Sequence, residues 1–156
     1  MEKENKSKVW IVMGILSALF LLWTIPLLFL SGGQVILEDG LKYASSSFDI
    51  TNLDAAGLGY LNMSMLKPLW EEVWIGILGI YCAVNLKKMK KHAWWLSLFW
   101  GIMLITNAAV QGILEVAILN WSSACIQTYL FLVLGTIAVA SLLVTKKNYF
   151  SNLAQG

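Results

Sequence analysis

The stretch that decides the fold is "AWWLSLFWGIMLITNAAVQGILEVAIL", residues 93–119, an apolar run with a single charged side chain, Glu115. A helix needs about 20 predominantly apolar residues to cross the hydrocarbon core of a bilayer, and this run is longer than that. It lacks the apolar–polar alternation of a membrane-barrel strand. The stretch therefore predicts a membrane-spanning helix.

Three more apolar runs of this kind flank it, at residues 9–30, 68–86 and 123–145. We expect an all-α fold, a four-helix transmembrane bundle with antiparallel neighbours, in which residues 1–156 form a single integral membrane domain. The run at 9–30 is too long for the 7–15-residue apolar region of a signal peptide, so we expect a retained helix.

The composition agrees with this class of protein. Of the 156 residues, 58% are hydrophobic and 13% are charged, and the mean hydropathy is +0.70. A soluble domain has about a quarter of its residues charged. The net charge of +2 is too small and too localised to indicate nucleic-acid binding.

The basic residues predict the orientation. They gather before the first run, between the second and third runs, and after the fourth, at Lys3, Lys6, Lys8, Lys87, Lys88, Lys90, Lys91, His92, Lys146 and Lys147. With four spans these segments share one side, which the positive-inside rule makes the cytoplasm. We expect both termini there and a long, partly helical extracytoplasmic loop at 31–67. The expected location is the plasma or cytoplasmic membrane, with an organelle membrane as the alternative.

Tryptophans are expected at both membrane interfaces. Trp10, Trp94 and Trp95 fall at the inner one and Trp70 and Trp121 at the outer one. The remaining three are expected to pack within or against the bundle: Trp23, Trp74 and Trp100.

Asn107, Gln111 and Glu115 form a polar row within the deciding stretch. Steps of four residues advance about 40° around a helix, so the row occupies an arc of about 80°. Ala108 and Gly112 beside it would let another helix approach closely. Because unpaired polar groups are costly in lipid, we expect the row to face protein or a cavity.

The depth of the row suggests a site. Counted from Trp95, Asn107 lies about 18 Å into the membrane and Glu115 about 30 Å, at the outer boundary. Glu71 and Glu72, counted from Lys87, lie about 23–24 Å up, and Gln127 is in the first turns of the fourth helix. The candidate ligand-binding residues are therefore Glu71, Glu72, Asn107, Gln111, Glu115 and Gln127.

Structural explanations compete with this one. Glu71 and Glu72 follow Pro68, and acids in a first helical turn are favoured by the macrodipole. Asn107 and Gln111 could be interhelical hydrogen-bond partners, and Glu115 could lie at the water line. Their coincidence at one depth favours a functional role, because an ionisable group within a span is a functional-site candidate.

Metal and cofactor sites are not expected. The chain has one histidine, and its two cysteines, Cys82 and Cys125, would lie roughly 15–20 Å apart. This is beyond the Cα separation of about 7 Å that a disulfide allows, so two free thiols are expected. With no clustered ligands we expect neither a haem nor a zinc site.

Three functions remain open. The first is binding of a small or lipid-like ligand, or of a partner's transmembrane segment, in an outward-facing polar pocket. The second is an enzyme acting on a lipid-soluble substrate with Glu72 or Glu115 as general acid or base. The third is an accessory subunit or homo-oligomer. The layout is similar to that of claudin-like proteins, but their paired loop cysteines are absent, and we assign no family.

Overall fold

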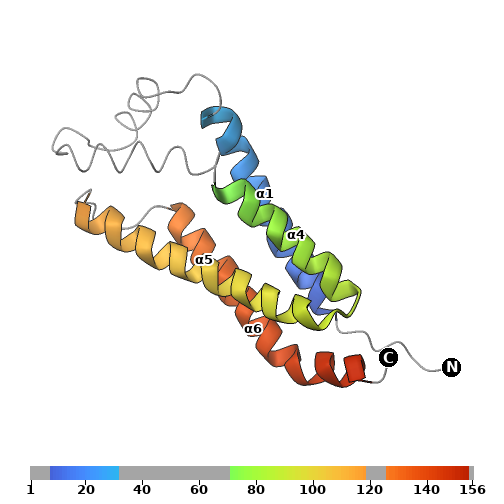
Figure 1. Ribbon diagram of the computed structural model, residues 1–156. Helices are drawn as coiled ribbons and strands as arrows, with labels where there is room; N and C mark the ends of the chain where they lie inside the picture. The colour runs from blue at the N-terminus through green and yellow to red at the C-terminus, as the bar shows by residue number, and fades with distance from the viewer. Residues whose placement is uncertain (1–7, 32–70, 119–125, 155–156) are drawn as a thin grey trace.

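The computed structural model describes residues 8–31, 71–118 and 126–154. They form four helices: α1 (Val9–Ser31), α4 (Val73–Lys87), α5 (Lys91–Ile118) and α6 (Ile126–Ala154) (Figure 1). Helices α1, α5 and α6 are long and apolar enough to cross a membrane, whereas α4, with 15 residues, is apolar but shorter. The all-helical prediction is confirmed within these ranges. The predicted loop, from residue 32 on, lies outside them.

The helix bounds follow the apolar runs closely for α1 and α5, which were predicted at 9–30 and 93–119. The predicted start of α4 at residue 68 lies outside the described residues. Glu72 already has helical backbone angles, with φ −67° and ψ −36°, so helical conformation extends back past Val73.

The end of α6 was predicted wrongly at residue 145, since the helix continues to Ala154. The apolar run stops at Lys146, but tertiary contacts stabilise further turns. Tyr149 is fully buried and donates a hydrogen bond of 2.9 Å to the Lys90 carbonyl, and the Phe150 ring packs edge-on against Trp94. Figure 1 shows these last turns bent away from the axis of the rest of the helix.

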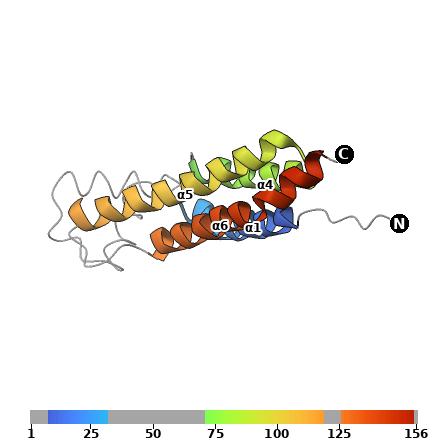
Figure 2. The ribbon, with the colours of Figure 1, turned by 90° about the horizontal axis from the view of Figure 1, so that it is seen from below.

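The helices pack as two antiparallel pairs, α1 with α4 and α5 with α6, which join through α4–α5 and α1–α6 contacts (Figures 1 and 2). Glycines allow the two helices of each pair to approach each other closely. A Cβ on Gly135 would lie 2.8 Å from the Gly101 carbonyl oxygen and 3.0 Å from the Ile105 backbone nitrogen. A Cβ on Gly79 would collide with the Ser17 hydroxyl of α1. Gly79 and Gly135 therefore lie at packing faces of α4 and α6.

The connection from α4 to α5 is a Schellman motif. Lys90 N–H donates to the Asn85 carbonyl at 3.1 Å, and Met89 N–H donates to the Leu86 carbonyl at 3.0 Å. Met89 has a φ of 53°, the left-handed conformation that glycine usually supplies at this position. Its side chain is half-buried against the core, so packing offsets the backbone strain.

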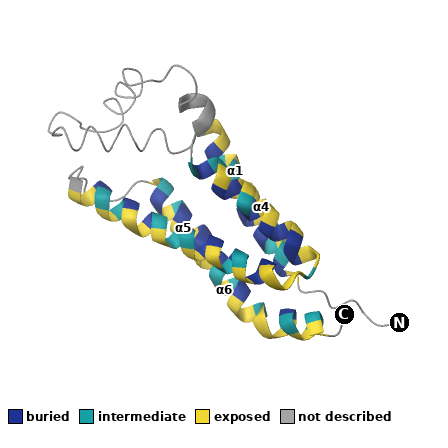
Figure 3. Ribbon diagram, in the orientation of Figure 1, coloured by how far each residue is buried: buried dark blue, intermediate teal, exposed yellow. Residues whose placement is uncertain are grey.

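The buried side chains face one another between the helices, and the outward faces are apolar (Figure 3). Phe20, Trp100 and Phe131 form an aromatic centre, with ring centroids 6.4 Å apart for Phe20–Trp100 and 4.9 Å for Phe20–Phe131. Trp100 is buried as predicted, but Trp74 is 66% exposed, so its expected packing position was wrong. Large exposed apolar faces on every helix suit a lipid environment.

Charge is segregated along the bundle. The described lysines lie at the end where α4 connects to α5: Lys8, Lys87, Lys88, Lys90, Lys91, Lys146 and Lys147. Contacts tie this end together, since Lys87 Nζ lies 4.9 Å from the Trp10 ring centroid of α1. The acids of the described ranges lie towards the opposite end: Glu71, Glu72 and Glu115. The segregation matches the charge pattern on which the predicted orientation rests.

Candidate binding site

The polar row of α5 lies partly in the protein interior. Gln111 and Glu115 are 5% and 3% exposed, and Asn107 is half-buried. Within the row, Gln111 Nε2 donates a 2.8 Å hydrogen bond to Glu115 Oε1. The expectation that this row faces protein rather than lipid is correct for Gln111 and Glu115.

Glu72 is fully buried where α1, α4 and α6 meet. Its carboxylate accepts a hydrogen bond from Thr24 of α1 at 3.5 Å and another from Gln127 of α6. It makes no side-chain capping bond to the first turn of α4. Helix capping therefore does not account for Glu72, whose side chain links helices instead.

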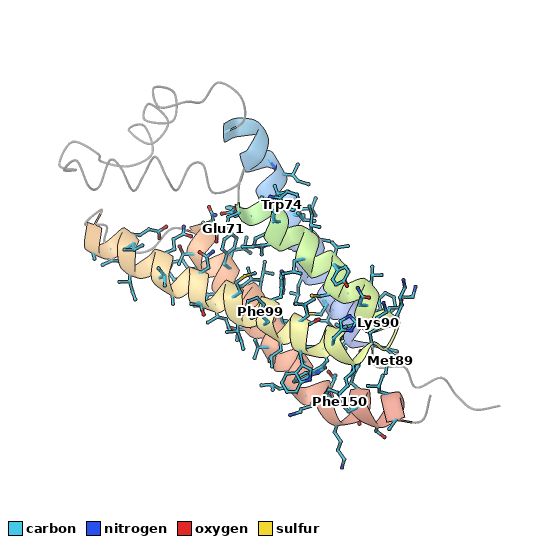
Figure 4. The ribbon with its side chains drawn as sticks, viewed as in Figure 1. Glu71, Trp74, Met89, Lys90, Phe99 and Phe150 are labelled. Carbon is cyan, nitrogen blue, oxygen red and sulfur yellow. The ribbon has the colours of Figure 1, made fainter. Side chains whose placement is uncertain are left out.

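Glu71 turns to α5. Asn107 Nδ2 donates a 2.8 Å hydrogen bond to Glu71 Oε1, and both side chains are half-buried. Figure 4 shows Glu71 at the beginning of α4 and Lys90 beyond its other end. Two consecutive glutamates thus contact different helices, Glu71 towards α5 and Glu72 towards α1 and α6.

Glu115 contacts α6 as well as its own helix. Thr128 Oγ1 donates a 3.0 Å hydrogen bond to Glu115 Oε2. Thr128 directly follows Gln127, the donor to Glu72, so two consecutive residues in the first turn of α6 bind carboxylates from two other helices. Glu72 and Glu115 therefore lie at one level of the bundle, as the count of helical rise predicted.

These contacts form three groups, Thr24–Glu72–Gln127, Asn107–Glu71 and Gln111–Glu115–Thr128. The backbone joins them, because Glu71 is next to Glu72 and Gln127 is next to Thr128. We call the eight side chains the carboxylate–amide cluster. It contains all six candidate residues predicted from the sequence and draws on all four helices.

Several hydroxyl and amide side chains elsewhere in the spans differ from the cluster, because they donate to carbonyls of their own helix. The hydroxyls of Ser17, Ser97, Thr106 and Thr136 each donate to the carbonyl four residues earlier, at distances of 2.7–3.0 Å. Asn85 donates in the same way to the Tyr81 carbonyl at 2.8 Å. Such bonds satisfy a hydroxyl or amide inside a span without a partner helix.

The cluster is rich in acceptors and has no described basic residue beside it. Its three carboxylates face amide and hydroxyl donors, and the described lysines are at the other end of the bundle. The first turn of α6 favours negative charge nearby through its macrodipole. Among the described residues, no three His, Cys, Asp or Glu side chains are grouped to hold a metal ion. The arrangement is suited to a hydrogen-bond donor or a cationic group.

Two members of the cluster were missed from the sequence, Thr24 and Thr128. Both are buried hydroxyls inside apolar runs, where a single threonine is common. A signal did exist for Thr24, because Met13, Ser17, Phe20 and Thr24 repeat at helical spacing and all are buried on one face of α1. Cys82 is a buried free thiol as predicted, and Cys125 lies outside the described residues.

Comparison of the chain with known protein families, curated proteins and solved structures finds no match.

Proposed function

We propose that this chain is a small polytopic membrane protein whose carboxylate–amide cluster binds a small or lipid-like ligand or the transmembrane segment of a partner. In this proposal the lysine end faces the cytoplasm and the cluster lies in the outward half of the bundle. The three apolar helices that are long enough to span a membrane support the setting. The positive-inside rule supports the orientation.

The observation that carries the proposal is the binding of Glu72 and Glu115 by the consecutive residues Gln127 and Thr128. Both carboxylates are buried, and buried acids in a span are costly to keep. Packing alone does not require them, because apolar residues of similar volume often give equal or greater stability than a buried polar network. Binding of a ligand or a partner segment would explain why several acids and amides meet at one level of the bundle.

Access to the cluster is provided by its half-buried members, Glu71, Asn107 and Gln127. The other carboxylates, Glu72 and Glu115, are buried. An occupant with N–H or O–H donors, or with a positive charge, would meet the Glu71–Asn107 pair first. It would compete with Asn107 for Glu71, whose Oε1 accepts the 2.8 Å bond between these two side chains.

Photocrosslinking in native membranes tests the proposal. Leu114 lies about 20° around the helix from Asn107, on the cluster side of α5, and is half-buried. Ile113 is 67% exposed and points away from the cluster. A photoreactive residue at position 114 is expected to give an adduct of defined mass, which mass spectrometry identifies as a small molecule, a lipid or a partner peptide.

The matched control is the same photoreactive residue at position 113, which should give only a broad mixture of bulk lipids. The defined adduct at position 114 is expected to disappear when Glu72→Gln and Glu115→Gln are introduced together. It should survive Asn85→Leu, which removes a buried amide outside the cluster. Identical adducts at both positions, unaffected by the glutamate substitutions, would refute the binding role.

A further inference from the structure

The end of the bundle opposite the cluster carries a ring of exposed basic side chains, which we call the cationic collar: Lys8, Lys87, Lys88, Lys90, Lys91, His92, Lys146 and Lys147. They come from the start of α1, the connection between α4 and α5, and the late turns of α6. The described acids, Glu71, Glu72 and Glu115, lie at the other end. Within the described ranges, nothing of opposite charge neutralises the collar.

Tryptophan rings hold part of the collar at one level. Lys146 Nζ lies 5.5 Å from the Trp94 ring centroid and 5.8 Å from that of Trp95, and Lys87 is placed similarly over Trp10. Trp95 is 52% exposed. A half-exposed tryptophan at the end of an apolar span is typical of the membrane–water interface, at the depth of lipid headgroups. The ammonium groups over these rings therefore lie at headgroup depth.

The backbone beneath the collar is fixed before anything binds. The Schellman bonds set the path of residues 88–90, and Met89 turns inward against the core. Tyr149 of α6 holds the Lys90 carbonyl at 2.9 Å. Lys88 and Lys90, on either side of Met89, are exposed. Because little backbone freedom remains to be lost, binding of anions here costs less ordering entropy.

From this arrangement we propose that the cationic collar is a docking surface for the headgroups of anionic phospholipids in the leaflet at that end. The apolar outward faces of the helices place the collar at a bilayer surface, and its charge is complementary to lipid phosphates. Each lysine near an anionic membrane surface contributes about fivefold in affinity. The inference requires membrane insertion but is independent of what the carboxylate–amide cluster binds.

Native mass spectrometry of the full chain in mild detergent tests the inference. The probe is an equimolar mixture of phosphatidylglycerol and phosphatidylcholine with identical acyl chains. Wild type should retain phosphatidylglycerol preferentially. The ratio of bound phosphatidylglycerol to bound phosphatidylcholine should fall at least tenfold in the variant Lys88→Gln/Lys90→Gln/Lys146→Gln/Lys147→Gln. The four matching Lys→Arg substitutions should leave this ratio unchanged. An unchanged preference in the glutamine variant would overturn the inference.

Two measurements on the wild-type protein do not depend on the folding of any variant. Raising the salt from about 0.05 M to about 0.5 M should lower the preference for phosphatidylglycerol, because exposed charges are screened within a few ångströms at the higher ionic strength. Inorganic phosphate at equal concentration should not displace the bound lipid. A salt-independent preference, or full displacement by phosphate, would contradict a lipid-headgroup surface.

Discussion

Gln127 donates a hydrogen bond to Glu72, although the two residues are 55 positions apart in the chain. Through this bond the first turn of α6 holds the beginning of α4, and through Thr128 it also holds α5. Loss of any member of this arrangement leaves a buried polar group with fewer partners. A single substitution in the cluster should therefore lower the free energy of unfolding. Replacing all partners of one group together should recover most of that loss.

Glu115→Leu is expected to lower the free energy of unfolding by about 1–3 kcal/mol, because Gln111 and Thr128 lose a buried acceptor. Removing all three polar groups together, with Gln111→Leu, Glu115→Leu and Thr128→Val, should restore most of that loss. Unfolding in detergent, followed by circular dichroism, measures both. If the triple variant were as unstable as the sum of the single variants, the three side chains would not act as one group.

The control for this series is Asn85→Leu. Asn85 is 4% exposed, and its amide bonds to the Tyr81 carbonyl of its own helix. That carbonyl keeps the regular backbone bond of the helix, so the substitution should cost less than Glu115→Leu.

Gly135→Ala should destabilise the bundle by about 1–3 kcal/mol, because backbone atoms of α5 cannot move aside for a new methyl group. The added Cβ would lie 2.8 Å from the Gly101 carbonyl oxygen. Gly14→Ala is the matched control, since the nearest atom to its new Cβ is 3.9 Å away. Thermal midpoints of both variants in one detergent check the prediction, and equal midpoints would show that α5 and α6 are not in backbone contact.

Composition and periodicity predicted much of the fold because burial in lipid imposes a long apolar run on each span. The bounds of α5 were close for this reason. The last turns of α6 were missed because Tyr149 and Phe150 are held by contacts with Lys90 and Trp94, which no local pattern records. Trp94 was assigned to the interface, yet it is fully buried beneath Lys146.

The candidate site was predictable where polar side chains interrupt an apolar run, as Gln111 and Glu115 do. Helical rise then gave their common depth with Glu72. The partners within the cluster were not predictable, because which donor faces which carboxylate depends on the rotation of each helix. Thr24 and Thr128 illustrate this, since both look like ordinary span residues until Glu72 and Glu115 are placed beside them.

Trp100→Phe should cost about 1–3 kcal/mol of unfolding free energy. The indole N–H of Trp100 donates a 2.8 Å bond to the Ile75 carbonyl, which joins α5 to α4, and the smaller ring leaves a void beside Phe20. Trp74→Phe is the control, because Trp74 is 66% exposed and should change stability little. Denaturant titration of both proteins in detergent measures the difference, and equal costs would contradict the packing of Trp100 between these helices.

Tyr149→Phe should lower the unfolding free energy by about 1 kcal/mol and loosen the end of α6, because the bond to the Lys90 carbonyl is lost. Hydrogen exchange of residues 146–154 should become faster, while exchange in α1 stays unchanged. Tyr129→Phe, at a side chain that is 51% exposed, is the control. Unaltered exchange at the end of α6 would mean that Tyr149 does not hold it.

The central claim is the proposed orientation, in which the carboxylate–amide cluster lies in the outer half of the membrane and the cationic collar lies at its cytoplasmic face. Single cysteines on a background of Cys82→Ala and Cys125→Ala test it most directly, one replacing exposed Asn148 near the collar and one replacing Ile126, which is 73% exposed at the cluster end. In sealed vesicles, a membrane-impermeant maleimide should label position 148 only from the cytoplasmic face and position 126 only from the opposite face. Labelling of both positions from the same face would contradict the claim.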